Sequence, residues 1–193
     1  MSQAQFLEIE IDKGELAELE KLLDPRDLDV ITGAALNDTL KKLRSLITKL
    51  AAKKIGLKQK QIRRRMWIKK ARRTRLTGRI TGGRFGWPIS HNKHMKQNEV
   101  GVIIGRGKKK KLHRHAFIAT MPTGHRGAFV RKTSERLPLR ELKTESITQV
   151  VLESGQLESL IRQGDEFLAK RLKQRVELHY ERKAAKAAFL EKR

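Results

Sequence analysis

The amino-acid sequence predicts an α+β fold in which a small antiparallel β-sheet is flanked by a long N-terminal helix and a long C-terminal helix. Apolar residues recur every three or four positions over residues 27–56 and again from residue 157, as in amphipathic helices. Alternating apolar residues between positions 100 and 131, bounded by glycine and proline, predict the sheet. Because no low-complexity linker divides it, the chain of residues 1–193 is expected to form a single domain.

The N-terminal segment, residues 1–26, is acidic. Apolar and acidic residues alternate over residues 6–12, which predicts a short edge strand. Residues 15–23 then have the spacing of a short amphipathic helix.

The first long helix is expected over residues 27–56. Asp24 and Pro25 favour a start there, because aspartate caps helix N-termini and proline fits the first helical position. Gly56 favours the end of this helix, because glycine is common just after the last helical residue. Five apolar residues lie on one stripe of this helix and are expected in the core: Leu36, Leu40, Leu43, Ile47 and Leu50.

Residues 57–134 are basic and predict mainly β-structure. One or two helical turns are expected over residues 58–65, followed by an extended segment from Met66. A long loop is expected over residues 78–98, because five residues there interrupt regular structure: Gly78, Gly82, Gly83, Gly86 and Pro88.

A β-hairpin is expected beyond this loop. Its strands are residues 116–121 and 128–131, and Phe117 and Phe129 are expected to face each other across them. Residues 135–193 predict an extended connector, a short helix over residues 146–153 and the C-terminal helix.

Charge is unevenly distributed along the chain, which carries +24 overall. Residues 1–38 have a net charge of −7, residues 39–134 of +28 and residues 135–193 of +3. Such a middle segment repels itself unless an anion screens it. Two partners fit: nucleic-acid phosphates, or the acidic N-terminal segment within or between subunits. A solvated face without a specific partner is the third possibility.

No catalytic, metal or cofactor site is predicted. There is no cysteine, and two histidine pairs, His91 with His94 and His113 with His115, stand in a region almost free of carboxylates. A nuclease would need acidic metal ligands in that region. No apolar run approaches the ~18 residues that span a bilayer, so no membrane partner is expected.

Two groups of basic residues are candidates for facing nucleic acid, because clustered Lys and Arg side chains contact phosphates without reading sequence. They are Lys69, Lys70, Arg72 and Arg73, and Lys108, Lys109, Lys110 and Lys111. The second group is expected at a glycine-flanked tip without nearby acids. Arg63, Arg64 and Arg65 follow the long helix and are candidates for subunit contacts instead.

Several segments carry a resemblance to a known family. They are HAFIATM at residues 115–121, TGHRGAF at 123–129, RLPLREL at 136–142, ALN at 35–37 and IRRR at 62–65. Together they resemble the bacteriophage minor tail protein Z family, over about residues 34–150.

The resemblance implies a non-enzymatic virion protein, made in the host cytoplasm, that acts at the head-proximal end of a phage tail, where tail completion and head joining occur. By analogy with tail-terminator and neck proteins it implies a homo-oligomer, a sixfold ring, that contacts other tail or neck proteins and lets DNA pass. Further interface candidates lie in the resembling segments: Gly124, His125, Arg126, Gly127, Pro138, Arg140 and Glu141.

A second class of function stays open on composition alone. A sequence-nonspecific nucleic-acid-binding protein, associated with the ribosome or the nucleoid, would have the same basic middle segment. It would bind as a monomer, with an affinity that falls steeply with salt.

Overall fold

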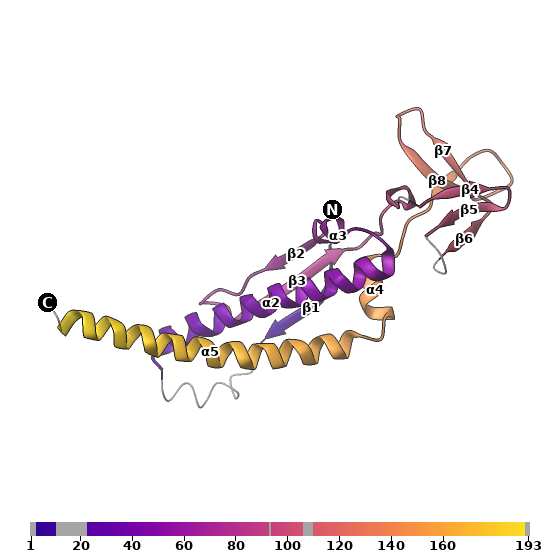
Figure 1. The fold of residues 1–193 in the computed structure, drawn as a ribbon. Helices are drawn as coiled ribbons and strands as arrows, with labels where there is room; N and C mark the ends of the chain where they lie inside the picture. The colour runs from indigo at the N-terminus through magenta and orange to yellow at the C-terminus, as the bar shows by residue number, and fades with distance from the viewer. Residues whose placement is uncertain (1–2, 11–22, 93, 106–109, 192–193) are drawn as a thin grey trace.

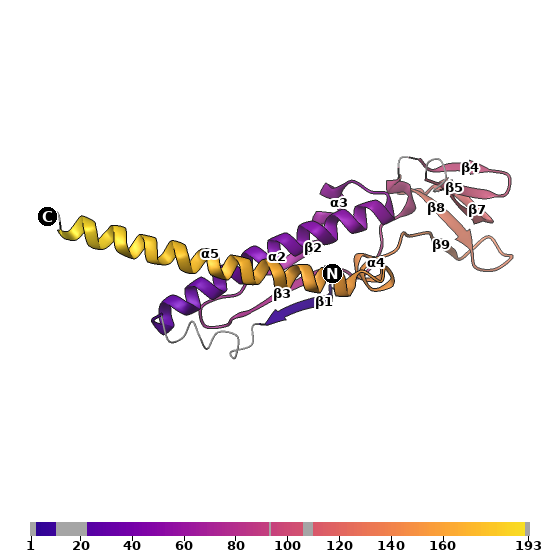
Figure 2. The same cartoon turned by 60° about the horizontal axis from the view of Figure 1, so that its bottom comes forward.

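The computed structural model describes residues 3–10, 23–92, 94–105 and 110–191. Two long helices, α2 (Pro25–Ile55) and α5 (Leu157–Glu191), lie along an elongated body (Figure 1). Three antiparallel three-stranded sheets complete the fold, and two of them are grouped at the end of the molecule away from the C-terminus (Figures 1 and 2). The predicted α+β class with two long helices is confirmed, with three small sheets in place of one.

Helix α2 begins two residues before the predicted start at residue 27 and ends one residue before the predicted end at Gly56. Pro25 is its first residue, although the Asp24 side chain makes no capping hydrogen bond. At the other end, Gly56 has a φ of 78°, and its amide donates to the carbonyl oxygen of Ala52. Four of the five predicted stripe residues are buried and the fifth, Leu50, is half-buried.

The first sheet packs against α2. Its strands are β1 (Gln3–Glu10), β2 (Met66–Lys69) and β3 (Thr77–Gly83), in the order β1-β3-β2. Strand β1 lies at an edge, as predicted. The short helix expected over residues 15–23 falls almost entirely outside the described residues.

The prediction of a long loop over residues 78–98 is wrong. Residues 78–83 belong to β3, the central strand, and residues 96–98 form strand β4 (Lys96–Asn98). Packing explains one of the glycines of β3: a Cβ at Gly78 would collide with Leu40 of α2. Close contact with a helix therefore outweighs the low strand propensity of glycine.

Between the first sheet and the other two, the chain contains the 3₁₀ helix η1 (Ile89–His91). The second sheet has the order β4-β5-β6, with β5 (Gly101–Ile104) and β6 (Lys111–Arg114). The third has the order β7-β8-β9, with β7 (Ala116–Thr120), β8 (Arg126–Arg131) and β9 (Leu139–Glu141).

These two sheets share a small core around Ile89, Val102, Ala116 and Ala128. The predicted hairpin is confirmed in β7 and β8: Phe117 pairs with Phe129, with ring centroids 6.4 Å apart.

Two further clusters fill the body along α2. The cluster that contains Leu40 joins α2 to the first sheet, to the short helices α3 (Gln59–Arg63) and α4 (Ile147–Glu153) and to Leu160 of α5. The other joins α2 to α5 around Leu168. Gly164 of α5 packs against α2: a Cβ at this position would lie 3.2 Å from Cδ1 of Leu43. That contact lets the long C-terminal helix pack along α2.

Candidate nucleic-acid interface

The basic residues that follow β2 lie on a short turn before β3. Arg72 and Arg75 exchange two backbone hydrogen bonds of 2.9 Å, which close this turn. We call residues 69–75 the basic turn. Its four candidate side chains are exposed to solvent: Lys69, Lys70, Arg72 and Arg73.

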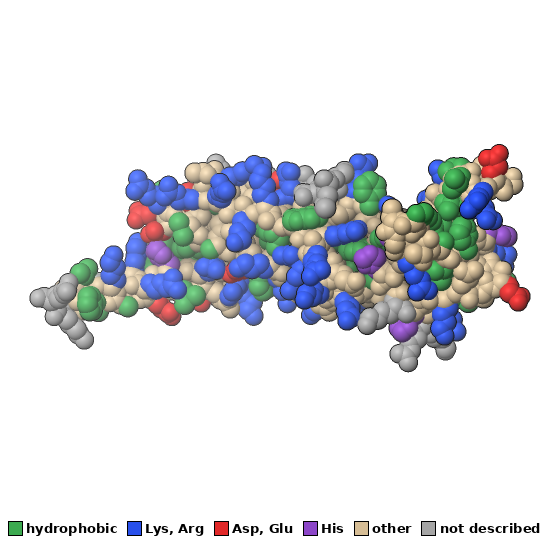
Figure 3. All heavy atoms as spheres, turned by 90° about the horizontal axis from the view of Figure 1, so that it is seen from above, with side chains coloured by type: hydrophobic (Ala, Val, Ile, Leu, Met, Phe, Trp, Pro, Cys, Tyr) green, Lys and Arg blue, Asp and Glu red, His purple; other side chains and the backbone are tan. Residues whose placement is uncertain are grey.

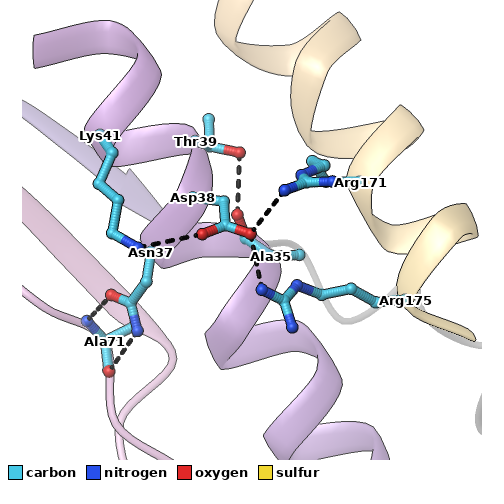
Figure 4. A network of polar contacts seen from close by, with 8 residues as sticks. All are labelled: Ala35, Asn37, Asp38, Thr39, Lys41, Ala71, Arg171 and Arg175. Atoms are coloured by element: carbon cyan, nitrogen blue, oxygen red, sulfur yellow. Dashed lines mark hydrogen bonds and ion pairs between the residues drawn. The ribbon is translucent and has the colours of Figure 1, made fainter. Parts of the chain in front are cut away.

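The basic turn is anchored to α2 through its only buried residue. Ala71 is 6% exposed and packs in the cluster with Leu36. Its amide donates to Oδ1 of Asn37 at 2.9 Å, and its carbonyl accepts from Nδ2 of Asn37 at 3.1 Å (Figure 4). The basic residues on either side of Ala71 therefore stand on a fixed backbone.

The charge of the basic turn is not compensated by the described part of the chain, where no carboxylate pairs with its four candidate side chains. Arg75 donates instead to the Thr77 hydroxyl at 2.7 Å. The turn borders a cavity of about 820 Å³. Figure 3 shows that Lys and Arg dominate the face seen from above, with acidic side chains mainly toward its two ends. Such a surface attracts polyanions.

The second predicted lysine group is only partly described. Lys108 and Lys109 lie outside the described residues, and Lys110 is exposed. Lys111 lies in β6, and its Nζ is 4.0 Å from Oε1 of Glu145. The expectation that these lysines lack nearby acids is therefore wrong for Lys111, because folding brings residue 145 to β6.

The three arginines after α2 have different surroundings. The Arg65 side chain donates to the carbonyl oxygens of Phe85 and Gly86, at 3.2 and 3.1 Å, and its guanidinium lies 4.6 Å from the Trp87 ring centroid. These contacts tie β2 to the segment after β3. Arg63 and Arg64 are exposed, and their roles in subunit contacts stay predictions.

The residues of the resembling hairpin gather on the outer face of the third sheet. Gly124 has a φ of 78° in the turn, which suits glycine. At Gly127, a Cβ would lie 2.8 Å from the Phe129 ring and 3.0 Å from Oε1 of Glu141. Nε2 of His125 is 2.7 Å from the same oxygen. The motif therefore has a structural explanation: Phe129 covers Gly127, and His125 joins two strands.

The remaining interface candidates surround this cluster. Arg126, Pro138 and Arg140 are exposed, whereas Glu141 is half-buried beside His125. The structure thus places the hairpin candidates together at one end of the molecule, apart from Arg63 and Arg64.

Comparison with protein-family models decides the family. The model of prophage minor tail protein Z (GPZ) matches residues 15–183. The chain belongs to this family. Searches of curated proteins and of solved structures return no match. As a minor tail protein, this member of the family is a structural component of a phage tail.

In this minor tail protein, three acids of residues 1–38 pair with α5, namely Asp24, Asp27 and Asp38. Oδ2 of Asp38 is 2.6 Å from Arg175 and 3.2 Å from Arg171 (Figure 4). Oδ2 of Asp27 is 3.3 Å from His179 and 3.1 Å from Lys183.

Two described acids of residues 1–38 pair with the middle segment, residues 39–134. Glu8 pairs with Arg79 at 3.0 Å, as the charge distribution predicts, and Asp38 pairs with Lys41 at 3.3 Å. The sequence signal for the contacts with α5 was a stripe of basic residues four positions apart: Arg171, Arg175, His179 and Lys183.

Asp38 contacts three basic side chains, those of Lys41, Arg171 and Arg175. Burial acts to raise the pKa of its carboxyl group, but hydrogen bonds from Arg175 and Lys41 and the charges of those residues outweigh burial and lower the pKa below the usual 3.8. Asp38 therefore stays ionised between α2 and α5.

Among the described residues, no group of three or more His, Cys, Asp or Glu side chains could hold a metal ion. No described helix is long and apolar enough to span a bilayer.

Proposed function

We propose that this minor tail protein acts at the head-proximal end of the tail, where six copies form a closed ring around the passing DNA. The observation that supports DNA passage is the basic turn: exposed Lys and Arg side chains on an anchored backbone, with no carboxylate partner in the described part of the chain.

The physical argument concerns what a DNA conduit needs. A duplex carries a negative charge about every 1.7 Å along its axis, and clustered cations screen it without selecting a sequence. Exposed lysines and arginines retain their hydration and their freedom to move, so a passing duplex meets weak contacts and does not stall. Lys110 is proposed to contribute to the same screening.

Subunit contacts are proposed for a different set of residues. Those among them with exposed side chains are Arg63, Arg64, His125, Arg126, Pro138 and Arg140. Neutralising Arg63 and Arg64 together is expected to block assembly. The matched change at Lys109 and Lys110 is expected to leave assembly intact and alter DNA retention.

Two measurements test the proposal. Native mass spectrometry and electron microscopy of the purified protein should show a closed ring, and antibody labelling of virions should mark the head-proximal end of the tail. A protein that stays monomeric at all concentrations, or a label at the distal tip, would contradict it.

The same basic turn favours a second candidate, a sequence-nonspecific nucleic-acid-binding protein. That candidate is supported if the protein binds duplex DNA as a monomer and is missing from purified virions. The ring proposal requires the opposite result for both.

A further inference from the structure

A second basic cavity lies where α2 meets the second and third sheets. Its volume is about 450 Å³, and it is lined by the last turn of α2, by β6 and by the segment after β9. Lys53, Lys54, Lys111, His113 and Lys143 contribute to its wall. We call this cavity the junction cleft. It is separate from the basic turn.

The junction cleft concentrates positive charge. Among the described residues that line it, Glu145 is the one carboxylate, and it lies 4.0 Å from Lys111. Lys53 and Lys54 are exposed and have no ion pair within the described part of the chain. Burial, and then the nearby charge of Lys111, lower the pKa of His113 and favour its neutral form, so the positive charge of the cleft comes from its lysines. The cleft is thus suited to an anionic group.

The apolar residues of the cleft wall also determine which kind of anion fits. Ile55, Ile89 and Ile104 line the cleft together with the lysines. A DNA phosphate has no apolar group to cover these isoleucines. A protein segment that alternates acidic and aliphatic residues satisfies both parts of the wall, through ion pairs and burial of apolar surface.

This chain contains such a segment. Residues 14–20 read GELAELE, with three glutamates and two leucines. Their structure lies outside the described residues. Three nearby acids that follow this segment are already paired with α5, namely Asp24, Asp27 and Asp38.

The segment cannot reach the junction cleft of its own subunit. Lys53 lies 28 residues along α2 from Pro25, which is about 42 Å at 1.5 Å per residue. The ten residue steps from Glu15 to Pro25 span at most about 36 Å when fully extended. An occupant from this chain must therefore come from another copy.

We propose that the junction cleft binds the acidic segment of residues 14–20 from a second copy of this chain. The two surfaces differ, so the contact is head-to-tail, the type that closes into a ring when the rotation between subunits allows it. This inference deepens the proposed ring and rests on it.

The first experiment tests the contact without requiring a ring. A peptide of residues 11–22 is titrated by calorimetry into the full chain carrying Glu15→Lys and Glu18→Lys, whose own segments no longer compete. Adding Lys53→Gln and Lys54→Gln should weaken peptide binding at least tenfold, whereas the matched control Lys58→Gln and Lys60→Gln on α3 should change it less than twofold. Equal binding to both variants would overturn the inference.

Competition identifies the source of the anion. A 12-base-pair duplex and inorganic phosphate, each added at moderate ionic strength, should fail to displace the peptide. Displacement by the duplex at stoichiometric concentration would assign the cleft to DNA and overturn the proposal.

The second experiment separates this inference from the ring. Lys53→Glu with Lys54→Glu should prevent assembly, as should Glu15→Lys with Glu18→Lys, and a chain carrying all four changes should assemble again. Circular dichroism confirms that each variant is folded. If the wild type forms rings and the Lys53→Glu, Lys54→Glu variant does too, the cleft assignment fails while the ring stands. If the wild type forms none, the ring fails, and peptide binding alone decides whether the cleft takes the segment.

Discussion

Asn37 and Ala71 exchange two hydrogen bonds across 34 positions of sequence, so that α2 directly holds the backbone of the basic turn. The amide side chain satisfies both the donor and the acceptor of a partly buried residue. This explains a polar residue on the inward side of α2, next to the fully buried Leu36.

Replacing Asn37 by Ala should lower the free energy of unfolding by about 1 to 3 kcal/mol, because Ala71 loses both partners. Amide hydrogen exchange should rise at Ala71, and DNA affinity should fall although every cation is retained. Asn98→Ala is the control, since Asn98 accepts a hydrogen bond from the Gly101 amide far from the basic turn. It should reduce stability and leave DNA affinity unchanged. Unaltered DNA affinity in Asn37→Ala would show that the anchor does not matter for binding.

Neutralising the basic turn should change the salt dependence of DNA binding. With Lys69, Lys70, Arg72 and Arg73 all replaced by Gln, the slope of log K against log salt should become shallower by about 2 to 4, since each lost phosphate contact removes about 0.9. A set of four exposed residues of α5 provides the control: Lys170, Lys173, Arg182 and Lys186. Its neutralisation should shift the slope by less than about one unit. Equal shifts in the two sets would mean that binding follows net charge alone.

The two hairpin glycines should respond differently to substitution. Gly124→Ala should cost about 1 to 2 kcal/mol through its positive φ alone, because a Cβ there meets nothing within 4 Å. Gly127→Ala should cost about 1 to 3 kcal/mol and displace Phe129 or Glu141, which a changed His125 signal in NMR would report. Chemical denaturation gives both costs. A neutral Gly127→Ala would mean that Phe129 moves away freely.

The Asp38 cluster should make stability depend on pH at the acid end. Because folding lowers the pKa of Asp38, its contribution is fully present above the unfolded value near 3.8 and is lost as pH falls through the lower folded value. At pH 7, Asp38→Asn should cost about 1 to 3 kcal/mol, since Arg171 and Arg175 lose their shared carboxylate.

The control for that measurement is Asp165→Asn, an exposed acid on α5, which should change stability by less than about 0.5 kcal/mol. The difference between wild type and Asp38→Asn should shrink as the pH is lowered from 5 to 3. A difference that stays constant over this range would show that Asp38 does not act through its charge.

Local patterns in the sequence were sufficient for the elements whose residues contact mainly their neighbours. The three-and-four spacing from Leu36 to Ile47 identified the buried side of α2, and Gly56 marked its end. The pairing of Phe117 with Phe129 followed from alternation and a short turn, because the strands of a hairpin meet across few residues.

Contacts between distant segments required the tertiary structure. The glycines of β3 led to the prediction of a loop, because the neighbouring sequence does not indicate that Gly78 packs against Leu40. From the sequence, the side chains of Arg65 and Lys111 were expected to contact a partner molecule. In the fold, Arg65 donates to two carbonyl oxygens and Lys111 lies near Glu145. Sequence alone thus determined the long helices, the hairpin and the positive charge of the middle segment. Which cations the fold satisfies and which it leaves open depends on side chains brought together from dozens of residues apart, so only the tertiary structure decided it.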